Sequence, residues 1–176
     1  EYKNTLAIIK AHLAFYAWIP SRFRWSLLLA ASYYFYAVWR LDYLIFILFS
    51  TIVDYFVAIR MAQLSIQAQR RKYLYFSLLT NLGLLFSLKY FNFFSESVDT
   101  LFGRFHLSPQ LPILDVILPV GISFYTFQTL SYTIDVYRGR LLPEKHFGRF
   151  ALFVSFWPQL VAGPIERSER LLPQLN

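Results

Sequence analysis

The sequence predicts an all-α, polytopic membrane helical bundle of about four to five transmembrane helices, plus a short re-entrant or interfacial helix. Three observations predict this fold class. Hydrophobic residues make up 57% of the 176 residues and charged residues only 15%, against roughly 45–50% and about 25% in globular domains. The mean hydropathy is +0.42. The apolar residues gather in long runs, and the basic residues fall between those runs.

Four runs are apolar enough to cross a bilayer as helices, which pair every backbone polar group internally where water is absent. They span residues 24–40, 41–59, 73–94 and 113–137. Only Arg40 and Asp42 separate the first two runs, which predicts a tight helical hairpin. Lys10 and His12 interrupt residues 6–20, so this stretch indicates an incomplete first membrane helix. We expect the whole chain to form one membrane domain, the amino-terminal part of a larger core.

Charged residues in the gaps predict the orientation of the bundle. The gap over 60–72 contains basic residues and no acid, so it should face the cytoplasm. The loop over 95–112, which contains Glu96 and Asp99, should lie outside, and the basic stretch 138–149 inside. The run 147–161 is apolar but short and is interrupted by a Trp-Pro pair, which predicts the re-entrant or interfacial helix.

The net charge of +7 raises the question of nucleic-acid binding. The basic residues form no single stripe, so this class of partner is not indicated. The chain contains no cysteine, which excludes disulfide and thiolate chemistry. The pattern indicates a multi-pass protein whose main partner is the lipid bilayer.

A polar stripe marks the last predicted span. At about 100° per residue, polar or small side chains recur within an arc of roughly 80°: Gly121, Tyr125, Gln128, Tyr132 and Asp135. Lipid cannot pair such groups, so the face must meet other protein or a wet cavity. Two interpretations stay open, namely hydrogen bonding between helices and the lining of a substrate channel.

Several ionisable or polar residues lie within predicted spans. Asp54 is deep enough to need a partner or a function, whereas Lys89 can reach the headgroup region. Asn81 is expected to hydrogen-bond between helices. Asp135 and Arg138 are three residues apart and could pair on one helix face.

No metal or catalytic-triad pattern is visible. The three histidines, His12, His106 and His146, lie outside the middle of every predicted span. None has a second ligand or an orienting acid at a suitable spacing on a helix, so no metal site is predicted.

Two sequence blocks resemble a known family. They are LPVGISFYTFQTLSYTIDVYRG from Leu118 onward and FALFVSFWPQLVAGPIERSERLLPQL from Phe150 onward. They are similar to the membrane-bound O-acyltransferases, and within them to the bacterial branch of alginate O-acetylation and D-alanyl transfer membrane proteins. The segments SYYFYAVWRLDYL and LKYFNFF fit the same branch, so the resemblance covers roughly residues 22–176.

The resemblance implies functional residues. Positions similar to the tunnel-forming region of the family give substrate-tunnel candidates, namely Tyr125, Gln128, Tyr132, Asp135, Tyr137 and Arg138. Positions with a structural role in the family motifs would be Pro119, Gly121, Ser123, Phe124, Pro158, Gly163, Pro164 and Arg167. The family uses a membrane-buried catalytic histidine, which the resemblance places beyond Asn176; the three histidines here do not match its motif. No catalytic residue is therefore assigned within this segment.

The resemblance also implies an activity. Part of a bacterial inner-membrane O-acyltransferase would move an acyl group, acetyl in the first instance, towards hydroxyls of an exported or cell-envelope polysaccharide. No bound cofactor is implied, and the donor would be an acyl thioester, either acetyl-CoA or an acyl carrier. Periplasmic acetylation proteins are the expected partners. The alternatives are a transporter or flippase, because polar residues also line transport paths, and an inactive membrane scaffold.

Overall fold

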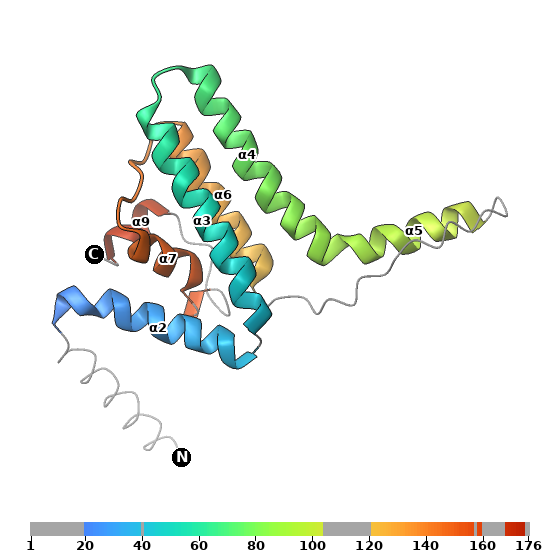
Figure 1. Ribbon diagram of the computed structural model, residues 1–176, viewed down its shortest axis with the longest axis horizontal. Helices are drawn as coiled ribbons and strands as arrows, with labels where there is room; N and C mark the ends of the chain where they lie inside the picture. Colours follow the sequence, from blue (N-terminus) through green and yellow to red (C-terminus); the bar gives the residue numbers. More distant parts are fainter. Residues whose placement is uncertain (1–19, 40, 104–120, 157, 160–167, 175–176) are drawn as a thin grey trace, which may run out of the picture.

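In the computed structural model, the described residues are 20–39, 41–103, 121–156, 158–159 and 168–174, and all their regular elements are helices. Figure 1 shows their arrangement. The elements are α2 (Ser21–Trp39), α3 (Leu41–Gln63), α4 (Gln67–Leu85), the π-helical segment η1 (Phe86–Tyr90), α5 (Phe91–Gly103), α6 (Ile122–Tyr137), α7 (Phe147–Ser155) and α9 (Ser168–Gln174). The predicted all-α class is confirmed for this part of the chain.

Helices α3, α4 and α6 form the centre of the molecule, and each packs against the other two (Figure 1). A connection at residues 64–66 joins α3 to α4, so the two helices return antiparallel. Their buried residues recur at three- and four-residue spacing, as on α4, where Leu74, Ser77, Asn81 and Leu85 are buried. This spacing places them on one helix face. Each central helix therefore turns one stripe of side chains inward.

Helices α2 and α3 do not form the predicted tight hairpin. The two helices diverge from the end of α2 and the start of α3, and α7 packs against both (Figure 1). Gly148 permits the close approach of α7 to α2, because a Cβ atom there would lie 2.4 Å from the Trp25 ring. The bulky Trp25 side chain on α2 therefore occupies the space over a glycine of α7.

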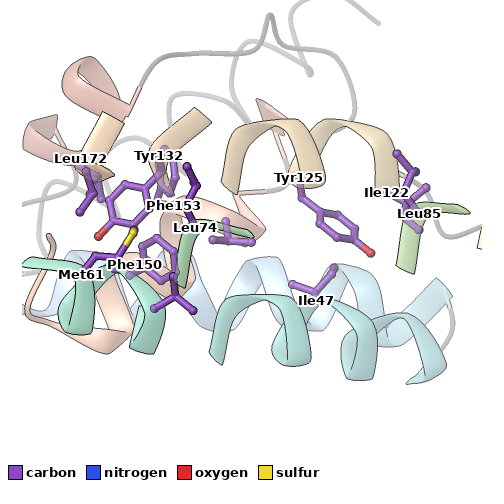
Figure 2. Close-up of a cluster of buried hydrophobic side chains, with 14 of the residues drawn as sticks. Ile47, Met61, Leu74, Leu85, Ile122, Tyr125, Tyr132, Phe150, Phe153 and Leu172 are labelled. Carbon is purple, nitrogen blue, oxygen red and sulfur yellow. The ribbon is translucent and has the colours of Figure 1, made fainter. Parts of the chain in front are cut away.

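Helix α7 is short, as predicted, but its C-terminal part is enclosed by protein. Residues 150–155 are all buried, and Phe150 lies against Tyr132 of α6 with ring centroids 4.7 Å apart. Figure 2 shows this aromatic group, with Phe153, beside Met61 and Leu172. The helix ends at Ser155, two residues before the Trp-Pro pair that was expected to interrupt it.

The third predicted span differs from expectation at its end. We expected a helix over 73–94 followed by an external loop, but α4 continues through η1 into α5 and ends at Gly103. A π-helical turn changes the direction of a helix, and Figure 1 shows α5 leaving the central bundle after η1. The loop prediction over 95–112 was therefore wrong for residues 95–103.

Two stretches of the described residues are long and apolar enough to cross a membrane, Leu44–Gln63 and Gln67–Phe102. They correspond to α3 and to α4 with its extension. The predicted spans over 24–40 and 113–137 are represented by α2 and by α6, neither of which belongs to these two stretches. Of the predicted stretches, residues 6–19 and 113–120 lie outside the described residues.

Candidate functional site

A polar cluster lies buried between α3 and α4. Asn81 Nδ2 donates to both carboxylate oxygens of Asp54, at 2.9 Å each. Ser77 Oγ donates to Asp54 Oδ1 at 2.5 Å. Asp54 and Ser77 are completely inaccessible to solvent, and Asn81 almost so. The carboxylate on α3 is therefore held by two neutral side chains of α4.

The same cluster extends to α6. Asn81 Oδ1 accepts a hydrogen bond from Ser50 Oγ at 2.6 Å and a long one from Thr129 Oγ1 at 3.5 Å. Asn81 thus links all three central helices, in agreement with the expected interhelical role. Within the described part of the chain no cation pairs with Asp54, so the ion pair considered for it is not present there. Hydrogen bonds from neutral donors instead offset the cost of removing the Asp54 carboxylate from water.

The predicted polar stripe of α6 is buried against protein. Gln128 Nε2 donates to the Phe153 carbonyl of α7 at 2.7 Å. Tyr132 Oη accepts from the Glu144 backbone N–H at 2.9 Å. Among the described residues, the buried Tyr125 hydroxyl has no hydrogen-bond partner. Gln128 and Tyr132 thus make hydrogen bonds to a neighbouring helix and a loop, as the interpretation of the stripe as a hydrogen-bonding face expects. Tyr125 makes no such bond among the described residues.

The end of α6 carries the other tunnel candidates. Arg70 of α4 donates to the carbonyls of Val136 and Tyr137, at 2.9 and 2.8 Å. Its guanidinium lies 5.7 Å from the centre of the Tyr137 ring. A cation at this place satisfies C-terminal carbonyls and opposes the negative end of the helix dipole. Tyr137 is therefore engaged in holding the end of α6 to α4.

Asp135 and Arg138 do not pair as considered. Arg138 follows the last residue of α6 and is exposed, and the structure of this described segment contains no ion pair between the two side chains. The Asp135 carbonyl instead accepts from the Arg140 N–H at 3.0 Å in the turn that ends the helix. Whether either residue lines a tunnel stays a prediction.

Four of the motif residues are described. Gly121 precedes α6 with φ of 78°, a left-handed conformation that glycine adopts without a steric penalty. Ser123 Oγ lies 3.2 Å from Lys89 Nζ, which ties the start of α6 to η1. Phe124 and Pro158 are exposed. The remaining motif residues lie outside the described residues, namely Pro119, Gly163, Pro164 and Arg167.

His146 has a local structural role. Its Nδ1 accepts from the Arg149 N–H at 3.3 Å and so caps the start of α7. Its ring packs edge-on against Trp25 with centroids 4.7 Å apart. Among the described residues, no three His, Cys, Asp or Glu side chains converge to hold a metal ion.

Part of the cluster was not predicted from the sequence. Asp54 and Asn81 were predicted separately, without a bond between them, and Ser50, Ser77 and Thr129 were not predicted. Their spacing could have predicted the cluster, because Ser50 and Asp54 are four residues apart on one helix face, as are Ser77 and Asn81. Tyr36, which is 1% exposed, was not among the predicted site residues.

The arrangement can hold polar groups away from water. A buried carboxylate, several hydroxyls and two amides occupy the centre of an apolar helical bundle. Such groups in a membrane protein mark either hydrogen bonding between helices or a path for a polar substrate. The hydrogen bonds described above account for Asp54, Asn81 and Gln128, and they leave Tyr125 available.

Comparison with known proteins finds relatives over nearly the whole chain. It is 37% identical to the probable alginate O-acetylase AlgI of Azotobacter vinelandii, over 93% of this chain and 33% of the relative. The corresponding protein of Pseudomonas aeruginosa is 36% identical over 93% of this chain and 32% of its own length. A peptidoglycan O-acetyltransferase of Helicobacter pylori is 32% identical, over 85% of this chain and 32% of the relative.

The chain spans about one third of the length of these curated relatives. No family model and no solved structure matches it. The resemblance found in the two sequence blocks is thus confirmed at the level of homology.

Proposed function

We propose that this chain forms part of a membrane O-acyltransferase. It is homologous to bacterial polysaccharide O-acetylases over about one third of their length. The enzyme would move an acyl group, acetyl in the first instance, onto hydroxyls of an exported or cell-envelope polysaccharide. The observation that carries the proposal is the 32–37% identity to proteins named as alginate or peptidoglycan O-acetyltransferases.

The polar interior of the bundle supports this activity. Hydroxyls are weak nucleophiles at neutral pH, so acyl transfer needs a base and a stabilised oxyanion. A path with little water protects an activated acyl group from hydrolysis. The buried face of α6, with Tyr125, Gln128 and Tyr132, is the part of this chain proposed to border that path.

The proposal assigns the reactants by chemistry. The donor is an acyl thioester from the cytoplasm, either acetyl-CoA or an acyl carrier, and it is a substrate rather than a resident cofactor. The acceptor is a polysaccharide on the other side of the membrane, where periplasmic acetylation proteins would assist transfer. The catalytic base, a histidine in the family that the sequence resembles, is proposed to lie outside these 176 residues.

The membrane setting is part of the proposal. The chain would be a multi-pass part of the bacterial inner membrane, in which α2 and α6 complete a bundle of about four to five spans with the two apolar stretches. Its exposed apolar side chains, among them Ile45, Phe49 and Leu79, would face lipid. Nucleic acid is not a proposed partner.

Deletion and complementation would test the function. The acetyl-ester content of the envelope polysaccharide is measured in cells that lack the full-length gene, and then after complementation with the full-length gene. We expect loss on deletion and recovery on complementation. A matched strain that expresses the full-length protein at the same level with Gln128→Leu and Tyr132→Phe should show reduced transfer. Unchanged ester content after deletion would contradict the proposed function.

A further inference from the structure

The charges that flank α4 mark out a single membrane span. Residues 73–88, between Lys72 and Lys89, include no charged side chain. A helix from one lysine to the other is about 26 Å long, close to the roughly 30 Å of a bilayer's hydrocarbon core. Lysines at both ends can extend their ammonium groups to the headgroups. The residues after Lys89 therefore begin at the membrane boundary, although the apolar stretch Gln67–Phe102 continues through them.

The chain bends at this boundary. The π-helical segment η1 includes Lys89, whose side chain is exposed. Its Nζ lies 3.2 Å from Ser123 Oγ near the start of α6. Figure 1 shows α5 turning away from the axis of α4 after η1. Helix α5 thus leaves the bundle near the level at which α6 begins.

Helix α5 has one apolar face. At about 100° per residue, five apolar side chains fall within an arc of about 100°: Phe91, Phe94, Val98, Leu101 and Phe102. On this apolar face, Phe94 is 53% exposed, Leu101 55% and Phe102 42%. Glu96 and Thr100 lie on the opposite face and are exposed. The helix is therefore amphipathic, and its apolar face remains largely uncovered.

A ring contact shows which way the apolar face points. Phe94 packs against Phe86 at the start of η1, with ring centroids 6.1 Å apart. In a straight helix these two positions (94 minus 86) are separated by about 12 Å along the axis. The bend brings the rings together, and Phe94 lies on its inner side. That side is turned towards α4, and hence towards the hydrocarbon core that α4 is proposed to cross.

The surroundings of α5 favour lipid over water. Among the described elements, α5 packs closely only on its own continuation η1, so the bundle does not cover the apolar face. A contiguous exposed apolar surface is unfavourable in water and marks a site of interaction. An interfacial helix meets acyl chains on one face and water on the other. Phe93, which is 71% exposed, lies outside the apolar face and would remain among the headgroups.

We propose that α5 lies along the outer surface of the membrane as an amphipathic helix. Its apolar face inserts among the acyl chains of the outer leaflet, and Glu96 and Thr100 face water. The charge pattern of the gaps predicts that this side is the outer one. The apolar stretch Gln67–Phe102 then consists of one span, which ends near Lys89, and one helix that does not cross the membrane. This lipid contact goes beyond the proposed acyltransferase function and does not depend on it.

Spin labels on single cysteines of the full-length protein test this arrangement. Phe94→Cys and Leu101→Cys place a label on the apolar face, and Glu96→Cys and Thr100→Cys on the opposite face. The protein, kept free of other cysteines, is reconstituted into vesicles of phosphatidylethanolamine and phosphatidylglycerol. Power saturation compares collisions of each label with oxygen, which concentrates in hydrocarbon, and with a water-soluble nickel chelate. We expect oxygen to dominate on the apolar face and the chelate on the opposite face.

Controls calibrate the two environments. Leu79→Cys reports lipid, because Leu79 is 75% exposed and lies within α4. Ser65→Cys reports water, because Ser65 is exposed in the connection from α3 to α4. The Tm of each variant checks folding. If the loss of the Phe86 contact lowers the Tm of Phe94→Cys, Phe102→Cys replaces it on the same face.

Alternation between the two faces would support the interfacial helix. Oxygen dominance at all four positions would instead make α5 part of a membrane span, and chelate dominance at all four would place it in water. Protection of the apolar face from both reagents would show that protein covers it. Each of these three results would overturn the inference. None of them involves acetyl-ester content, so the acyltransferase function stands or fails separately.

Discussion

At the scale of single residues, the central problem is a carboxylate in an apolar bundle. Burying an ionisable group is unfavourable unless hydrogen bonds replace its water shell. Asp54 receives these bonds from Ser77 and Asn81, and Asn81 is itself fixed by Ser50. The cluster therefore depends on one amide that both donates to the acid and accepts from a hydroxyl.

Replacing Asn81 with leucine should destabilise the protein strongly. The change removes both amide donations to Asp54 and leaves the Ser50 hydroxyl without its acceptor. Because hydrogen bonds to charged groups contribute more than neutral ones, we expect a loss of at least about 3 kcal/mol. Thermal unfolding of the purified full-length protein measures it.

Thr80→Val is the control for Asn81→Leu. Within the described part of the chain, the Thr80 hydroxyl bonds only to the Phe76 carbonyl of its own helix, so its loss should be nearly neutral. Equal Tm values for the two variants would show that the cluster does not stabilise the bundle.

At the scale of helices, side-chain size sets how closely elements approach. The absence of a Cβ atom at Gly148 allows α7 to lie against Trp25 of α2, and His146 completes the contact by packing edge-on against the same ring. Another helical glycine, Gly83, faces open space. The two positions share a residue type and differ in their surroundings.

Alanine at these two glycines should act in opposite directions. Gly148→Ala forces the Trp25 ring to move and should destabilise the protein by about 1–3 kcal/mol. Gly83→Ala meets no neighbour and should stabilise α4 by about 0.5–1 kcal/mol through the higher helix propensity of alanine. Tm shifts of opposite sign are the expected result, and shifts of the same sign would contradict the packing of α2 on α7.

At the scale of the whole molecule, a group of basic residues and a pair of acidic residues lie towards opposite ends of the bundle. The connection from α3 to α4 is followed by Arg70, Arg71 and Lys72, whereas α5 carries Glu96 and Asp99. Figure 1 places that connection and α5 at opposite ends of α4. Basic residues near membrane helices remain on the cytoplasmic side, so α5 is expected on the outer side.

Cysteine labelling would test this orientation. The 176 residues contain no cysteine, so a single one can be introduced into a full-length protein kept free of others. Ser97→Cys on α5 and Ser65→Cys between α3 and α4 are matched, since both serines are exposed. A membrane-impermeant maleimide should label Ser97→Cys in spheroplasts and Ser65→Cys only after permeabilisation. The reverse labelling pattern would contradict the predicted orientation and place α5 on the cytoplasmic side.

Much of the fold could be predicted because it follows from local chemistry. Apolar runs of bilayer length predicted helices where α2, α3, α4 and α6 occur. Their ends were less predictable, because α5 continues the third helix through residues 95–103, where Ser95, Glu96, Ser97 and Asp99 are typical of a loop. The stripe of α6 was predicted from spacing alone, and the burial of Tyr125, Gln128 and Tyr132 agrees with it.

The pairing of helices could not be predicted in the same way. Asp54 was recognised as needing a partner, but a hydroxyl or amide on any helix would satisfy that need. Contacts between residues far apart in the sequence leave no local periodicity to detect.

The sequence by itself therefore determined the helical class, the approximate helices and the homology to polysaccharide O-acetylases. Composition and spacing act within single segments and suffice for these. Only the tertiary structure decided that Asn81 joins three helices and that α7 packs against both α2 and α3. These features depend on shape complementarity between distant segments, and packed side chains have that complementarity only in the assembled bundle.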